Sequence, residues 1–157
     1  MIEIKWEGPF LLNEVITKKD DGWNPDNNYE GNDYGLYQIY GQHILSGPDT
    51  LLYIGKATRQ TFSYRFRQHK KWVEKEKKIR IYLGRVYDSK KHSKIDNWRT
   101  WEDDVEDAEK ILIYKYTPNY NSSEIGDKPK LHHKRIKLVH SGRKHNLRYI
   151  DQAPKDF

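Results

Sequence analysis

The fold is set by two segments, which read YGLYQIY at residues 34–40 and TLLYIG at residues 50–55. Both are rich in tyrosine, isoleucine and leucine, which favour β-strands. The sequence between them contains the run Ser46-Gly47-Pro48-Asp49, which favours a turn. We therefore predict a β-hairpin over residues 34–55.

The residues after this hairpin predict two helices and a third strand. Apolar side chains recur at helical spacing from Phe62 to Val73, behind a threonine that can cap the helix. Residues 79–87 alternate between aliphatic and polar side chains, as in a half-buried strand. An apolar stripe then runs from about residue 96 to Tyr116, and Pro118 ends this second helix. The expected cap of the first helix is Thr58 or Thr61.

The two ends of the chain differ from this central part. Residues 2–17 predict a strand followed by a helical turn, and residues 18–33 have the composition of a surface loop. Residues 128–148 contain eight Lys and Arg side chains and no Asp or Glu. A terminal hairpin is predicted there, with strands near residues 136–139 and 147–150.

These patterns predict an α/β fold, because 157 residues suit one domain of ordinary size. The expected sheet is small, central and mainly antiparallel, with three strands flanked by helices. Residues 1–33 are interpreted as an N-terminal lead-in segment and residues 34–121 as the main domain. Residues 122–157 are interpreted as a basic C-terminal extension that ends in the predicted hairpin.

The composition limits the classes of function. Lys and Arg outnumber Asp and Glu by 29 to 23, which gives a formal net charge of +6. This excess favours a polyanionic partner, although a solvated basic surface gives the same totals. The chain has no cysteine, so a metal ion would need oxygen or imidazole ligands. No apolar run suits a membrane span and no signal-peptide pattern is present, so a cytoplasmic protein without a membrane partner is expected.

Five short motifs follow one another on the predicted hairpin and helices. They are Gly35-Leu36-Tyr37, Tyr53-Ile54-Gly55 with Lys56-Ala57, Arg65 with His69, Glu109, and the run Pro118-Asn119-Tyr120-Asn121. This series resembles the GIY-YIG nuclease superfamily, with Leu36 in place of the usual isoleucine. The resemblance covers residues 34–121 and implies the GIY-YIG nuclease fold and metal-dependent hydrolysis of DNA.

The resemblance also implies roles for individual side chains. Glu109 would bind Mg²⁺ or Mn²⁺, and its position at the edge of an apolar stripe suits a shielded carboxylate ligand. Tyr37 would act as the general base, provided that neighbours lower its pKa. Arg65 would contact phosphate with its planar, permanently charged guanidinium. The remaining expected contributors to catalysis are Tyr53 and His69, as proton relays or phosphate contacts, and Lys56, as a phosphate contact or a solvated cation.

Other positions of the motifs have an expected structural role. Gly35 and Gly55 would let the backbone approach closely beside the site, and Asn121 would hold the loop after the second helix against the sheet. Arg65 follows Gly55 by ten residues, two more than in many members of the superfamily. The arginine that contacts phosphate could therefore be Arg67 or Arg59, although the spacing to the histidine favours Arg65.

The partner implied by the resemblance is DNA, and the basic residues outside the motifs would bind its backbone. The expected DNA-binding residues are Lys70, Lys71, Lys130, Lys134, Arg135, Lys137, Arg143, Lys144 and Arg148. A restriction-type enzyme that cuts both strands would act as a homodimer. The alternatives are a nicking or structure-selective nuclease of repair or mobile elements, a non-catalytic nucleic-acid-binding module, and a basic protein-interaction domain.

Overall fold

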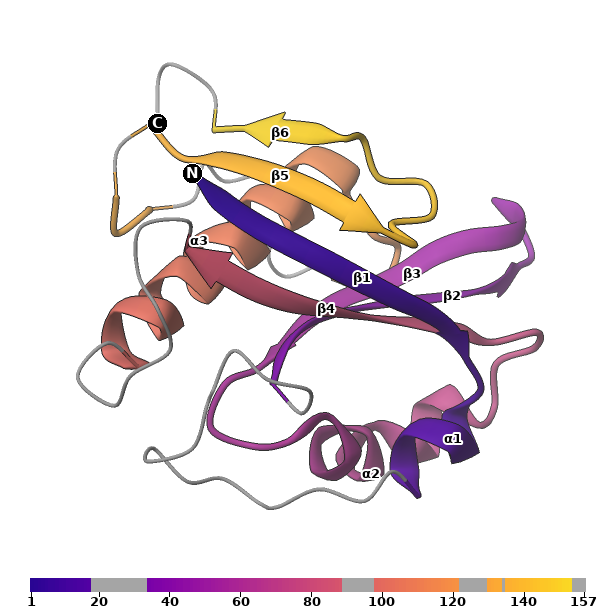
Figure 1. Cartoon of the computed structure of the whole chain (residues 1–157). Helices are drawn as coiled ribbons and strands as arrows, with labels where there is room; N and C mark the ends of the chain where they lie inside the picture. Colours follow the sequence, from indigo (N-terminus) through magenta and orange to yellow (C-terminus); the bar gives the residue numbers. More distant parts are fainter. Residues whose placement is uncertain (18–33, 89–97, 122–129, 134, 154–157) are drawn as a thin grey trace.

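The computed structural model describes residues 1–17, 34–88, 98–121, 130–133 and 135–153. Strands and helices alternate irregularly along these residues (Figure 1). In chain order the elements are β1 (Ile2–Phe10), α1 (Leu12–Ile16), β2 (Gly35–His43), β3 (Gly47–Ala57), α2 (Phe62–Val73), β4 (Arg80–Asp88), α3 (Trp98–Tyr116), β5 (Lys137–Gly142) and β6 (Ile150–Gln152).

One strongly curled sheet contains all the strands of the described residues, in the order β3-β2-β4-β1-β5-β6 (Figure 1). The pairs are antiparallel except for β1 and β5, which run parallel. The expected α/β fold and mainly antiparallel pairing are confirmed, but the expected number of three strands is wrong, because the sheet of the described residues has six strands and one parallel pair. The segment interpreted as a lead-in supplies a central strand, which joins β4 to the strands of the basic C-terminal segment.

The expected local elements are present with adjusted boundaries. The β2–β3 hairpin turns at residues 44–46, slightly before the predicted turn. Thr61, rather than Thr58, caps α2 by accepting a hydrogen bond from the backbone N–H of Tyr64. The C-terminal strands β5 and β6 pair as predicted, but residues 143–149 connect them in place of a tight turn at Ser141-Gly142.

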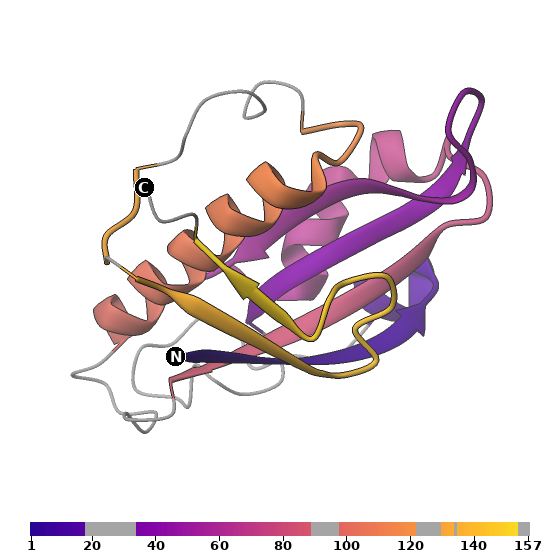
Figure 2. The same ribbon diagram turned by 90° about the horizontal axis from the view of Figure 1, so that it is seen from above.

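The sheet buries both of its faces, and each face has its own group of helices (Figures 1 and 2). One core cluster packs under α3 and includes Leu36 and Leu112, whereas the other packs under α1 and α2 and includes Phe66 and Leu83. Neighbouring residues of a strand point to opposite faces. None of the helices in the described part of the chain is long and apolar enough to cross a membrane.

A buried hydrogen-bond network connects β1 with the C-terminal strands. The indole Nε1–H of Trp6 donates to Nδ1 of His140 over 3.0 Å, and Nε2 of His140 lies 3.0 Å from a carboxylate oxygen of Asp151. The hydroxyl of Tyr116 on α3 donates to the same carboxylate oxygen over 2.9 Å. Because buried polar groups are costly without partners, this network stabilises one specific arrangement of β1, β5, β6 and α3.

Trp6→Ala should lower the free energy of unfolding by about 3–5 kcal/mol, because it removes a buried indole from the core. Trp6→Phe should cost less, since the ring stays and the main loss is the donor to buried His140, worth about 1–3 kcal/mol. Urea unfolding followed by circular dichroism would measure both. Ile44→Ala is the control, because this side chain is 99% exposed. Equal midpoints for Trp6→Ala and Ile44→Ala would show that β1 lies outside the cooperative core.

Candidate active site

Tyr37 lies at the centre of the candidate site, on the face of the sheet covered by α2. Its side chain is 0% exposed, and its hydroxyl is 2.7 Å from Nε2 of His69 on α2. The ring of Tyr37 lies over Gly55, its partner on the neighbouring strand. A Cβ at Gly55 would overlap both the ring and the hydroxyl. The absence of a side chain at Gly55 therefore gives Tyr37 the space it occupies.

The imidazole of His69 is oriented by two hydrogen bonds. The indole Nε1–H of Trp72 donates to Nδ1 of His69 over 3.0 Å. An indole nitrogen can only donate, so Nδ1 is the acceptor, and the neutral ring carries its proton on Nε2. That Nε2–H donates to the oxygen of Tyr37, which leaves the hydroxyl proton of Tyr37 free to point elsewhere. Tyr53 adds a third ring, 5.4 Å from His69 and 6.0 Å from Tyr37 between ring centroids.

Of the three candidate arginines, Arg65 is the one that lies beside Tyr37 and Tyr53. Its guanidinium is within hydrogen-bonding reach of the hydroxyls of Tyr37 and Tyr53. Its Nε–H is buried without a hydrogen-bond partner in the part of the chain that the structure describes. The other two candidates make contacts elsewhere: Arg67 donates to the backbone oxygen of Ile16 over 3.2 Å, and Arg59 forms an ion pair with Glu102 at 3.1 Å.

Burial controls the protonation of this group. Burial raises the pKa of Tyr37 far above its usual value, and the neighbouring Tyr53 adds to the shift. Arg65 opposes the shift but does not overcome it. Burial, and then the charge of Arg65, lowers the pKa of His69 to about 4. At neutral pH these residues therefore form a neutral phenol beside a neutral imidazole, and the expected lowering of the Tyr37 pKa does not arise from the side chains around it.

Glu109 lies within electrostatic reach of Tyr37, whereas Lys56 faces the other side of the sheet. Glu109 on α3 is partly buried, and its negative charge is among the causes that raise the pKa of Tyr37, so it lies within electrostatic reach. Lys56 is opposite Leu36 in the sheet register and therefore faces α3 rather than α2. Its ammonium forms an ion pair with Glu106 at 3.0 Å. The structure thus does not bring Lys56 together with Tyr37.

Gly35 and Asn121 have structural positions beside the site. Gly35 has a φ of +147°, and a Cβ there would overlap the backbone oxygen of Gly84 on β4. Asn121 is buried and bonds the backbone of Ile54 twice, accepting from its N–H over 2.9 Å and donating to its oxygen over 3.0 Å. The loop after α3 is thereby fixed to β3, which forms the edge of the sheet.

A second set of possible metal ligands lies along α3. Single ligand atoms of Asp103, Glu106 and His132 are all within 4.8 Å of one another. His132 reaches this helix because Asp107, which is buried, accepts the backbone N–H groups of His132 and His133. Carboxylate and imidazole ligands suit a divalent cation. The sequence signal is the three-residue spacing of the two carboxylates on one helix, but nothing local connects them to a histidine far along the chain.

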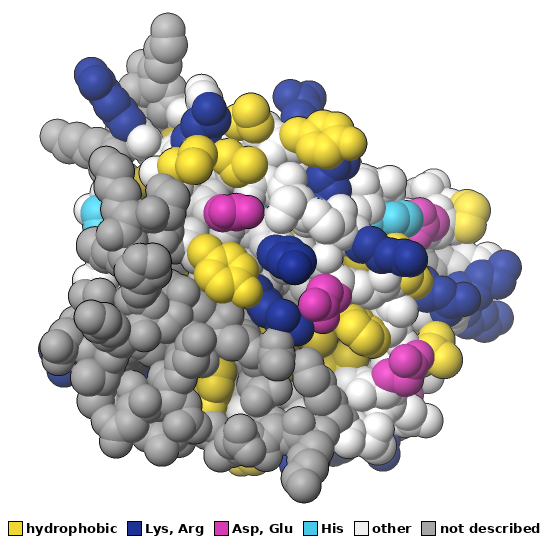
Figure 3. All heavy atoms as spheres, in the orientation of Figure 1, with side chains coloured by type: hydrophobic (Ala, Val, Ile, Leu, Met, Phe, Trp, Pro, Cys, Tyr) yellow, Lys and Arg dark blue, Asp and Glu magenta, His cyan; other side chains and the backbone are white. Residues whose placement is uncertain are grey.

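The expected DNA-binding residues fall on separate surfaces. Lys70 and Lys71 are exposed at the end of α2, whereas Lys130 and Arg135 are exposed before β5. Lys134 lies outside the described residues. Basic side chains are interspersed with hydrophobic and acidic ones on the face that Figure 3 shows. The other members of the set are Lys137 on β5 and Arg143, Lys144 and Arg148 in the loop between β5 and β6.

No family model matches the chain, and neither a curated protein nor a solved structure matches it. Functional inference therefore depends on the chemistry of the residues themselves. A buried arginine donor, two phenols and an oriented imidazole meet at one point, with a carboxylate in electrostatic reach. Such a group can bind an anionic oxygen and move a proton beside it.

Gly55→Ala should displace the ring of Tyr37 and break its hydrogen bond with His69, because the new methyl group occupies the space of that ring. We expect a loss of stability of about 1–3 kcal/mol, as for other overpacked sites. A double-mutant cycle with Tyr37→Ala tests the cause by urea unfolding. In the Tyr37→Ala background, Gly55→Ala should lower the free energy of unfolding much less than it does in the wild type. An unchanged cost in that background would mean that the glycine serves another purpose.

His69 should make the folded state less stable as the pH falls from 6.5 to 4. In this range the unfolded chain binds a proton at His69, whose ordinary pKa is 6.5, while the folded chain does not, because its pKa is about 4. His69→Gln should therefore flatten the dependence of stability on pH in this window. Proton NMR of the imidazole would measure the midpoint directly. A midpoint near 6.5 in the folded protein would contradict the burial of His69 beside Arg65.

Proposed function

We propose that this chain is a metal-dependent DNA endonuclease of the GIY-YIG type, which hydrolyses phosphodiester bonds. The observation that carries the proposal is the meeting of Tyr37, Tyr53, Arg65 and His69, with the charge of Glu109 acting on Tyr37. These residues come from separate elements of the chain, namely β2, β3, α2 and α3.

The proposal includes a finer interpretation of the fold. We infer that β2, β3, α2, β4 and α3 form the nuclease core of residues 34–121, as the resemblance implies. On this interpretation β1, β5 and β6 are additions that extend the core sheet beyond β4. The additions bring residues 137–142 of the acid-free basic segment onto the same sheet, which supports a role for that segment beside a nucleic acid.

The proposed chemistry begins with the scissile phosphate at Arg65. The partnerless Nε–H of Arg65 would donate to a phosphate oxygen, and the charge of the guanidinium would stabilise the negative charge that builds up as water attacks phosphorus. The Tyr53 hydroxyl would help orient the same phosphate. The bond between phosphorus and the 3′ oxygen then breaks, and that oxygen takes a proton from solvent water, which leaves 5′-phosphate and 3′-hydroxyl ends.

Tyr37 would receive the proton of the attacking water after it has released its own hydroxyl proton to solvent water. Its oxygen accepts hydrogen bonds from His69 Nε2–H and lies in reach of Arg65, and both donors stabilise the phenolate. The raised pKa of Tyr37 works against this role in the free protein. A substrate-bound cation held by Glu109 would supply Lewis-acid stabilisation and favour ionised neighbours.

Glu109 fits such a cation because it is a partly buried oxygen ligand on the helix beside the edge strand, and hard cations such as Mg²⁺ and Mn²⁺ prefer oxygen. The group of Asp103, Glu106 and His132 is the competing location for a metal ion. In that group the Glu106 carboxylate already interacts with Lys56 and His132. We assign the catalytic cation to Glu109, because its charge acts on Tyr37.

One observation favours the alternative of a non-catalytic nucleic-acid-binding module. Tyr37 is fully buried and carries a strongly raised pKa, which are properties of a packing tyrosine as much as of a base. Such a module would keep Arg65 and the basic surface for binding. Substrate would then associate in a salt-dependent manner without being cut.

Supercoiled plasmid should be nicked or linearised by the protein with Mg²⁺ or Mn²⁺ and left intact with EDTA. Glu109→Gln, Tyr37→Phe and Arg65→Ala should each lower the rate by about 100-fold or more, the usual size of such contributions. Arg67→Ala is the matched control, since it removes the same charge from the same helix but from a side chain that contacts α1. Gel electrophoresis measures cleavage, and discrete fragments would indicate a restriction-type homodimer.

His132→Ala separates the two metal locations in the same assay. Full activity in His132→Ala together with loss in Glu109→Gln supports the assignment of the cation to Glu109. The reverse pattern would move the metal to the group on α3. Salt-dependent binding without cleavage of plasmid, branched or single-stranded DNA by the folded wild type would instead establish the binding module.

A further inference from the structure

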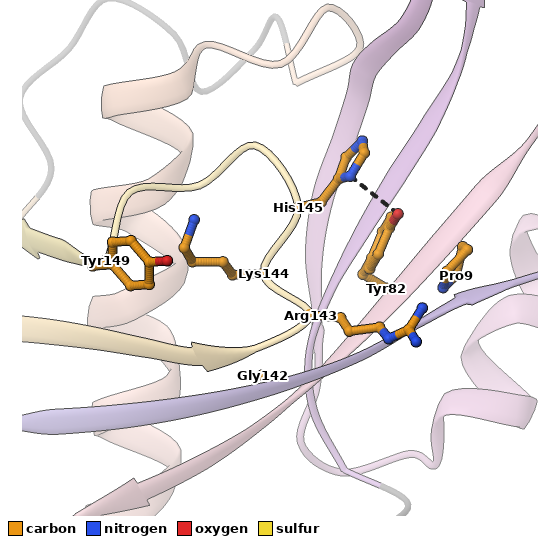
Figure 4. Close-up of a pocket in the computed structure, with 7 residues that line it drawn as sticks. All are labelled: Pro9, Tyr82, Gly142, Arg143, Lys144, His145 and Tyr149. Atoms are coloured by element: carbon orange, nitrogen blue, oxygen red, sulfur yellow. Dashed lines mark hydrogen bonds between the residues drawn. The ribbon is translucent and has the colours of Figure 1, made fainter.

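A hollow of about 380 Å³ lies on the sheet face opposite Tyr37 (Figure 4). In the pairing of β2 with β4, Leu83 is opposite Tyr37, whereas Tyr82, which lines the hollow, is opposite Gln38. Neighbouring residues of a strand point to opposite faces, so the hollow and Tyr37 lie on different faces of the sheet. The volume of the hollow is near the lower end of the roughly 300–1,000 Å³ typical of small-molecule pockets. A single nucleotide-sized group fits such a space, and a DNA duplex does not.

The loop between β5 and β6 forms one wall and is fixed by several hydrogen bonds. The backbone N–H of Arg143 donates to the oxygen of Trp6 over 2.9 Å. Nδ1 of His145 is 3.1 Å from the hydroxyl of Tyr82, and Nε2 of His145 is 2.7 Å from Asp49. The buried side chain of Leu147 anchors the same loop. The hollow is therefore preformed rather than created by a ligand.

The polar lining of the hollow is cationic. The guanidinium of Arg143 is exposed and has no carboxylate within ion-pair distance among the described residues. The ammonium of Lys144 donates to the backbone oxygen of Leu147 over 2.6 Å, which uses one of its three donors. The nearby carboxylate of Asp49 is already engaged by His145. Two cations thus remain available to an anionic group such as a phosphate.

Aromatic rings complete the lining. Tyr82 and His145 are stacked with centroids 4.8 Å apart. Tyr149 is 74% exposed, and the ammonium of Lys144 is 4.3 Å from the centroid of its ring. A large exposed ring beside the Lys144 ammonium is a suitable stacking platform for a nucleobase, because every base presents a flat π face. Figure 4 shows Tyr149 and Lys144 together at one side of the hollow, with Arg143 between them and Pro9.

We propose that this hollow binds one nucleotide unit, with its phosphate on Arg143 and Lys144 and its base on Tyr149. The unit is either a free mononucleotide or an unpaired nucleotide of a DNA strand, since both present the same phosphate and base. The site lies on the opposite sheet face from Tyr37 and needs no metal ion, so it stands whether or not the chain is a nuclease.

The test measures equilibrium binding of a fluorescent oligothymidylate by anisotropy, in EDTA so that no metal-dependent cleavage occurs. Tyr149→Ala should weaken binding by about 10-fold or more, and Tyr149→Phe should bind like the wild type because the ring remains. Arg143→Ala should also weaken binding, whereas Lys75→Ala, which removes an exposed cation that does not line the hollow, should not. Thermal melts would verify that these exposed substitutions leave the fold intact.

Competition identifies the source of the ligand. Displacement of the probe by thymidine monophosphate, lost in Tyr149→Ala, assigns the site to a free nucleotide. Displacement only by unlabelled single strand assigns it to an unpaired strand. Equal competition by inorganic phosphate and the mononucleotide would overturn the proposal, because the base would then contribute nothing. Equal losses in Arg143→Ala and Lys75→Ala would also overturn it, since binding would then reflect overall charge.

Discussion

The pairing of β1 with both β4 and β5 is the constraint on which the rest of the structure depends. This first strand lies between the hairpin-bearing half of the sheet and the basic C-terminal strands, which have no other connection within the sheet. Trp6 fixes the junction from the core side, because its indole both fills space and donates to His140. The candidate active site and the hollow behind the sheet are therefore parts of one continuous framework.

Two histidines of this framework are oriented in the same way. His69 and His140 each accept an indole N–H on Nδ1, from Trp72 and Trp6 respectively, so each neutral ring presents Nε2–H to its second partner. That partner is a phenol in the candidate site and the carboxylate of Asp151 in the C-terminal network. The same indole–imidazole arrangement thus places an N–H donor beside Tyr37 and links β5 to β6 through His140 and Asp151.

Local patterns predicted the hairpin, α2, β4 and α3, because alternation and helical spacing are properties of neighbouring residues. The residues that meet around Tyr37 were expected from the order of the short motifs and the family resemblance, not from alternation or helical spacing. They could not predict that β1 is central, because strand neighbours are chosen by burial across the whole chain. Nor could they decide between Arg65 and Arg67, which depends on the rotation of α2, or find the pairing of Lys56 with Glu106, which depends on how α3 crosses β3.

The central position of β1 also determines the order in which the sheet can be completed. Ile2 is synthesised well before either of its partners, because Asp88 and Leu138 come much later in the chain. Both edges of β1 therefore stay unpaired until these later residues are synthesised, and the middle of the sheet closes only after Leu138 is present. Long-range pairings of this kind slow folding and leave strand edges open to other chains in the meantime. Synthesis rate and chaperone capture thus become relevant to a protein this small.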